Sequence, residues 1–249
     1  MMLVFVRTLF GTLLVLPLFL KSGLRSLKTE QLSLNFLRGL LSISTVGLTF
    51  FALSHIPLAD AVAYSYLTPI FALVLTLLFL KERLSVKQVT AICVAFVGAM
   101  VLLRPGFQTF NIGIAASLGA ALCFAGTLIC MKILTRRESP KLVTVYGYII
   151  PLPISLLVSL GYWQWPEGAL QWGMVFLMSL LSVIAHLSMS QALSRADMNM
   201  LLPFDFVRLV FAAALGGLLF QDHLDWISFI GGTIILAASV ISSRQHMRK

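Results

Sequence analysis

Nine apolar segments, each about twenty residues long, run through the chain and constrain its fold more than any other feature. A helix needs about 20 apolar residues to cross the ~30 Å hydrocarbon core of a bilayer. Because lipid offers no hydrogen-bond partners, such segments fold as helices or as closed barrels. The sequence therefore predicts an all-α, polytopic membrane helix bundle. The expected spans are about 2–20, 33–54, 58–80, 87–103, 112–133, 142–162, 171–193, 199–220 and 227–243.

Composition and charge support the same interpretation. Only 11% of the 249 residues are charged and 59% are hydrophobic, whereas soluble domains carry about 25% charged residues. The net charge of +9 lies mostly in short loops between apolar spans, so a membrane explains it better than nucleic acid does. Fifteen of the 18 Lys and Arg residues fall on one expected side, and Arg104 alone falls in a loop on the other. Positive residues mark the cytoplasmic side, which predicts an inner-membrane protein with a cytoplasmic C-terminus.

An internal repeat appears when the chain is shifted along itself by about 140 residues. Ala52-Leu53-Ser54 then meets Ala192-Leu193-Ser194, and Phe71-Ala72 meets Phe211-Ala212, without a gap over about fifty residues. The second half shows five spans and the first half shows four. We therefore expect two inverted repeats of five helices, 1–106 and 107–249, with the first helix absent. Inverted repeats are typical of secondary transporters, whose substrate sites lie near the bilayer midplane.

Two charges interrupt the expected span 199–220. Asp205 and Arg208 are three residues apart, so on a helix they share one face and can pair. A central Arg or Asp costs about 2.5–3.5 kcal/mol to insert and normally faces a protein-lined cavity. The pair either holds helices together or forms a substrate site. In a site, Arg208 would bind a carboxylate, and Asp205 would hold Arg208 or bind an amine, which suits a zwitterionic, amino-acid-like metabolite.

Further polar residues are candidates for substrate binding. Under the repeat, Thr68 corresponds to Arg208, and both lie about 15 Å deep in their spans. Asp60, Tyr64 and Thr68 recur every four residues, so they share a helix face. They line a cavity or act as interhelical hydroxyl contacts, worth about 0.6 kcal/mol each.

The remaining candidates lie in other spans. His186 is expected to bind substrate, to relay protons, or only to hydrogen-bond to a neighbour. Arg7 is expected to contact substrate or Asp60, or to anchor its helix at the interface. Tyr146 and Tyr148, near the expected cytoplasmic end of their span, are further substrate-binding candidates. Pro151 and Pro153 follow them, free backbone carbonyls and are expected to form a hinge or merely a kink. Arg38, near the expected cytoplasmic end of its span, is expected to snorkel to the interface.

Several kinds of chemistry have no matching motif. The chain has no GxxxxGK[ST] phosphate-binding loop and no HExxH metal motif, so we expect no enzyme activity, cofactor or metal. The three cysteines, Cys93, Cys123 and Cys130, have no CxxC spacing and are expected to act as small packing residues.

Several motifs resemble those of a known family. Pro57-Leu58-Ala59-Asp60-Ala61, Leu80-Lys81-Glu82-Arg83-Leu84 and Leu103-Arg104-Pro105-Gly106 resemble EamA-type domains of the drug/metabolite transporter superfamily. Arg7 and the stretch from Pro203 to Arg208 look like the subgroup of S-adenosylmethionine uptake permeases. The resemblance implies a ten-helix transporter, from which this sequence departs by lacking the first helix.

Together these features predict a secondary transporter that moves a small organic metabolite by alternating access. Its expected partners are the small-molecule substrate and the lipid bilayer, with a coupling proton and a second copy of the chain as further candidates. The alternative is a non-transporting membrane protein, a truncated or partner-dependent remnant of such a transporter.

The charge asymmetry makes the first testable prediction. A cysteine placed at Gln108, in a variant without the native cysteines, should react with an impermeant thiol reagent added to intact cells. A cysteine placed at Ser85 should be protected under the same conditions. Labelling at Ser85 with protection at Gln108 would invert the topology.

Overall fold

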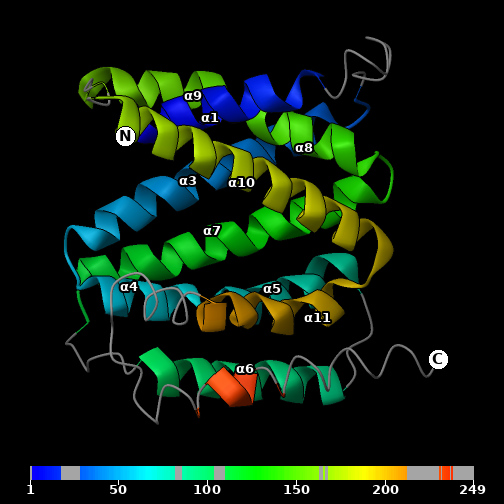
Figure 1. Cartoon of the computed structure of the whole chain (residues 1–249). Helices are drawn as coiled ribbons and strands as arrows, with labels where there is room; N and C mark the ends of the chain where they lie inside the picture. The colour runs from blue at the N-terminus through cyan, green and yellow to red at the C-terminus, as the bar shows by residue number, and fades with distance from the viewer. Residues whose placement is uncertain are drawn as a thin grey trace. The chain divides into compact units, whose positions relative to one another are not determined.

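The computed structural model describes residues 2–17, 29–81, 86–103, 110–162, 165, 168–211, 230, 232–235 and 237. Every regular element within these ranges is helical, which confirms the expected all-α class (Figure 1). The long elements are α1 (Met2–Val15), α3 (Leu32–Leu53), α6 (Val86–Leu103), α7 (Ile112–Thr135) and α10 (Gly168–Arg195). The shorter ones are α4 (Leu58–Ser65), α5 (Thr68–Leu75), η2 (Thr76–Leu80), α8 (Pro140–Ile149), α9 (Pro151–Ser159), η3 (Leu160–Tyr162), α11 (Met198–Leu201) and η4 (Leu202–Phe206).

Most of the expected spans are present as apolar helices. Within the described ranges, five are long and apolar enough to cross a membrane: Leu32–Leu53, Asp60–Leu80, Ile112–Thr135, Pro140–Ser159 and Gly168–Arg195. Met2–Val15 and Val89–Val101 are shorter apolar helices at two further expected spans. Of the last two expected spans, 199–220 is described only to Phe211 and 227–243 only in part; Gln108 and Ser85 lie outside the described residues.

The chain divides into two compact units. Unit 1 combines Met1–Ile43 with Cys130–Arg195, and unit 2 combines Ser44–Ile129 with Ala196–Lys249. Two of the three boundaries fall within continuous helices, α3 and α7, and the third follows the end of α10.

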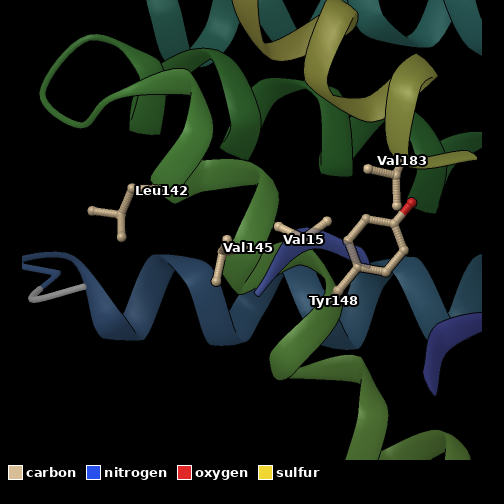
Figure 2. Packing of buried hydrophobic residues seen from close by; sticks show 5 residues of the cluster. All are labelled: Val15, Leu142, Val145, Tyr148 and Val183. Carbon is tan, nitrogen blue, oxygen red and sulfur yellow. The ribbon is translucent and has the colours of Figure 1, made fainter. Parts of the chain in front are cut away.

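In unit 1, α1 packs against α8, α9 and α10. One apolar cluster joins Val15 to Leu142, Val145, Tyr148 and Val183, and Figure 2 shows the Tyr148 ring between Val15 and Val183. The ring lies this close to α1 because Gly11 has no side chain, and a Cβ there would overlap the ring. A second cluster, nearer the start of α1, contains Met2, Phe5, Val6 and Val175.

The span that contains α8 and α9 is divided by its prolines, as the sequence predicts. Ser139 caps α8 by accepting a hydrogen bond from the Leu142 amide, and Pro140 occupies the first helical turn, where no partner for its nitrogen is needed. The helix is interrupted at Ile150, and Pro151 begins α9. Proline lacks an amide proton and cannot continue the hydrogen bonding of α8.

In unit 2, small residues bring α7 close to α3 and α4. Ala52, Ile56, Ala61, Ile114 and Ala116 form its apolar cluster. The Ser117 hydroxyl donates to the Ala61 carbonyl at 3.2 Å. Small side chains allow helices to approach closely in lipid, where packing replaces the hydrophobic drive between them. The same unit packs η4 against α5 and α6.

The contact at Gly11 generates a prediction. Gly11→Ala should lower the free energy of unfolding by about 1–3 kcal/mol, because the added methyl group displaces the buried Tyr148 ring. Gly173→Ala is the matched control, since a Cβ at this position in α10 meets nothing within 4 Å. It should be neutral, or stabilise by up to about 1 kcal/mol. Thermal unfolding of the purified chain in detergent measures both, and equal midpoints would contradict the packing.

Candidate functional site

The charged pair predicted from the sequence forms in unit 2. Asp205 lies in η4, a 3₁₀ helix that begins with Leu202-Pro203, and Arg208 follows in the next turn. Arg208 Nη2 lies 3.5 Å from Asp205 Oδ2, so the predicted pairing is confirmed. Asp205 lies near the end of η4, and Arg208 lies in the α-helical residues 207–211 that follow. Residues three apart face nearly the same side in either kind of helix, so the local backbone brings the two charges together.

A third residue, Tyr66, completes this cluster. The Arg208 Cζ lies 4.9 Å from the centre of the Tyr66 ring, within the range of a cation–π interaction. Tyr66 in turn stacks on Phe206, with ring centroids 5.7 Å apart. Both aromatic residues are buried, whereas 48% of the Arg208 side chain is exposed. One side of the guanidinium is thus held in place while much of it stays accessible.

Sequence reasoning missed Tyr66 because it treated 58–80 as one continuous helix. The structure ends α4 at Ser65 and begins α5 at Thr68, so Tyr66 lies in the turn between them. Pro69 was the available signal, since proline has no amide hydrogen to donate to the Ser65 carbonyl, where α4 ends.

Tyr64 and Thr68, which the sequence predicts on one helix face, both make packing contacts in the structure. Thr68 is buried and its hydroxyl donates to the Ala121 carbonyl at 3.4 Å. Tyr64 is partly buried and packs against the apolar cluster of unit 2. Of the two expectations for this face, the structure gives Thr68 the interhelical hydroxyl contact. A role for either residue in binding stays a prediction.

A second polar cluster forms in unit 1 from three predicted residues. The rings of Tyr148 and His186 meet edge to face, with centroids 5.4 Å apart. Arg7 lies close enough to both rings to act on them electrostatically. Tyr146, the fourth predicted residue of this unit, is partly buried against the apolar cluster around Tyr148.

Arg38 belongs to the same cluster, and the expectation that it would snorkel was wrong. Its side chain is buried, with 2% exposed, and Nη1 donates to the Val143 carbonyl of α8 at 2.6 Å. Gly147 makes this approach possible, because a Cβ there would lie only 2.7 Å from Arg38 Nη2. A glycine between Tyr146 and Tyr148, in an otherwise bulky stretch, was the signal for a side chain packed against it.

Other polar side chains of unit 1 tie its helices together. The Thr144 hydroxyl donates to the Ser190 hydroxyl at 3.1 Å, joining α8 to α10. Lys132 is buried in α7, and its Nζ donates to the Leu193 carbonyl at 2.9 Å. A cation near a helix C-terminus donates to the free carbonyls there and interacts favourably with the negative end of the helix dipole.

Across the described ranges, no three His, Cys, Asp or Glu side chains come together as metal ligands. Cys93, Cys123 and Cys130 are all free thiols.

The chain is similar to known transporters along almost its whole length. The model of the EamA-like transporter family matches residues 1–104 and 111–244. A riboflavin transporter of Vibrio cholerae is 28% identical over 98% of this chain and 83% of the relative. An S-adenosylmethionine uptake transporter of Rickettsia felis is 28% identical over 95% of this chain and 80% of the relative. The pseudopaline exporter CntI of Pseudomonas aeruginosa is 24% identical, over 97% and 85%.

A solved crystal structure shares the fold, with a TM-score of 0.84 at 19% identity, over 99% of this chain and 88% of that one. The family match covers more than half of the sequence and confirms the resemblance drawn from its motifs. The chain therefore belongs to the EamA-like transporter family and is a membrane transporter of small molecules, not an enzyme.

Proposed function

We propose that the chain is a secondary transporter that moves a small organic metabolite across the membrane by alternating access. The two moving parts would be the inverted repeats 1–106 and 107–249. Support comes from the relatives, which are named as transporters of riboflavin, S-adenosylmethionine and pseudopaline. It also comes from the repeat, since inverted repeats in secondary transporters place the substrate near the midplane.

The observation that carries the proposal is the cluster of Asp205, Arg208 and Tyr66. The guanidinium has a carboxylate and an aromatic ring on one side and keeps 48% of its side chain exposed. Arg presents a planar fork of donors that fits a carboxylate or phosphate through two parallel hydrogen bonds. Arg208 would take the acidic group of the substrate, and Asp205 would hold Arg208 or take an amine.

The geometry of the ion pair favours exchange with a substrate. Charge-assisted N–H···O hydrogen bonds are about 2.7–2.9 Å long, but Arg208 and Asp205 are 3.5 Å apart. The two charges therefore neutralise each other without a tight hydrogen bond. A substrate carboxylate can form the short bidentate contact that Asp205 does not make, which supports binding in preference to a purely structural role.

The finer features of the proposal come from the sequence. We place the protein in the inner membrane with a cytoplasmic C-terminus, because fifteen of the 18 basic residues fall on one side. A coupling proton and a homodimer complete the proposal. Asp205 and His186 are the side chains that could carry a proton at depth.

Uptake and efflux measurements test the proposed function directly. Cells that express the chain should move at least one labelled solute from a panel of amino acids, nucleosides and vitamins faster than cells that express an Arg208→Gln variant. If the chain moves none of these solutes although it is inserted in the membrane, transport is contradicted.

The ion pair generates a sharper prediction. Arg208→Gln should lower the initial transport rate at least ~30-fold, because losing a charged hydrogen-bond partner costs about 2 kcal/mol or more. Gln keeps hydrogen-bonding capacity, so the protein should still insert. The double variant Asp205→Asn with Arg208→Gln removes both charges. It should fold and remain inactive, because the substrate has lost its partner.

The control is Arg137→Gln, the same chemical change at an exposed position, which should transport normally. Rates are normalised to the amount of inserted protein. Full activity in the double variant would show that Arg208 serves only to neutralise Asp205.

A further inference from the structure

We propose that Arg38, Arg7, Tyr148 and His186 of unit 1 form an anion site that binds the carboxylate or phosphate group of a soluble organic anion. The site is distinct from the Asp205–Arg208–Tyr66 cluster. The inference rests on the proposed function only in taking this anion to be the transported solute.

The first argument is the missing counter-charge of Arg38. Its guanidinium has five N–H donors, and in the described part of the chain it makes one hydrogen bond, to the Val143 carbonyl. The side chains that act on it electrostatically are Cys130 and Tyr148, neither of which is a carboxylate. A buried charge without a partner is strongly destabilising, so retaining this one requires a compensating anion.

The second argument is that another cation faces the same place. Arg7 and Arg38 both act on the rings of Tyr148 and His186. Both guanidiniums therefore lie within electrostatic range of one pair of side chains, and an anion bound beside that pair would be attracted to both.

The third argument is the orphaned hydroxyl of Tyr148. Its oxygen is buried without a hydrogen-bond partner of normal geometry in the described residues, although Ser182 approaches it. Buried polar groups nearly always have partners, so the hydroxyl is available to donate to an acidic oxygen. Figure 2 shows the phenol oxygen on the side of Val183 in α10, the helix that also carries His186.

The depth of the cluster indicates the source of the anion. Tyr148 lies eight residues into the span Pro140–Ser159, which is about 12 Å at 1.5 Å per residue. The hydrocarbon core is about 30 Å thick, so the Tyr148 ring lies well inside it, whereas the Val143 carbonyl that Arg38 contacts lies only three residues into the same span. Lipid headgroups stay at the interface, so an anion that reaches the Tyr148 hydroxyl is a soluble solute.

Gly147 determines where the Arg38 guanidinium lies, and therefore where it can meet an anion. It leaves the space beside α8 that the Arg38 guanidinium occupies. A methyl group there would push the guanidinium away from the Val143 carbonyl. Gly147→Ala should therefore weaken anion binding without removing any charge or hydroxyl from the site.

The test measures binding to the purified full chain in detergent by its unfolding temperature. Two pairs of probes differ in charge but little in shape: benzoate and benzamide, and glutamate and glutamine. A third pair, uridine 5′-monophosphate and uridine, differs by the phosphate group. At least one acidic member should raise Tm by about 5 °C at roughly a hundred times its Kd, and its neutral partner should not. The pair that responds separates carboxylate from phosphate recognition.

Variants then assign the site. Arg38→Gln should abolish the shift, and Tyr148→Phe, which keeps the ring packing, should weaken affinity about fivefold. Arg137→Gln is the matched control and should keep the full shift. If Arg38→Gln does not fold, Tyr148→Phe and Gly147→Ala decide the question.

The proposal is overturned if no acidic probe outperforms its neutral partner, if Arg38→Gln keeps the shift, or if only added phosphatidylglycerol stabilises the chain. Wild-type transport of neutral or cationic solutes, combined with no anion-dependent shift, would refute the anion site and leave the proposed transport function intact. Anion binding without transport would support the anion site and contradict the proposed transport function.

Discussion

Inside a membrane-spanning bundle, a cation has to be matched by groups that the neighbouring helices supply, because water is absent. Arg38 and Lys132 each donate a hydrogen bond to a backbone carbonyl, that of Val143 and that of Leu193 respectively. Arg208 is matched by a carboxylate and an aromatic ring. These solutions differ in kind. A carbonyl accepts a hydrogen bond but leaves the positive charge un-neutralised, whereas the Asp205 carboxylate neutralises the charge of Arg208. The cations therefore link helices and also set the electrostatic character of each unit.

Close helix approach makes these contacts possible. Gly147 leaves room for the Arg38 guanidinium beside α8, and Gly39 lies against Ile150 where α8 ends. Gly11 does the same for the Tyr148 ring. Lipid tails are as apolar as leucine, so helices in a bilayer gain stability from fitted surfaces and interhelical hydrogen bonds. Glycines in α1 and α8 thus allow the side chains of Tyr148 and Arg38 to be enclosed by protein and kept from lipid. In unit 1, the same glycines that let helices pack closely also make room for the buried polar side chains.

The apolar spans could be predicted because their length follows from bilayer thickness alone, and the Asp205–Arg208 pair because a spacing of three fixes a shared face. The environment of Arg38 could not. Its position near the end of a span indicated an interface, but distance along a helix does not reveal what packs against it. Tyr66 was missed for a related reason, since the turn between α4 and α5 alters which side chains share a face. The repeat pointed to Thr68 as the partner of Arg208, yet its hydroxyl bonds to α7.

The two polar clusters place different demands on a ligand. At Arg208, an acidic substrate group would compete with Asp205, so binding would replace one ion pair by another and the net gain would be small. At Arg38, no described side chain competes, and an acid would fill donors that are otherwise unused. Exchange at the first cluster suits a solute that has to be released again, since transport requires weak enough binding for departure. The second cluster suits recognition, because its empty state is the costly one. A solute with an acidic group meets both demands, whereas a neutral solute would leave the Arg38 charge buried and unmatched.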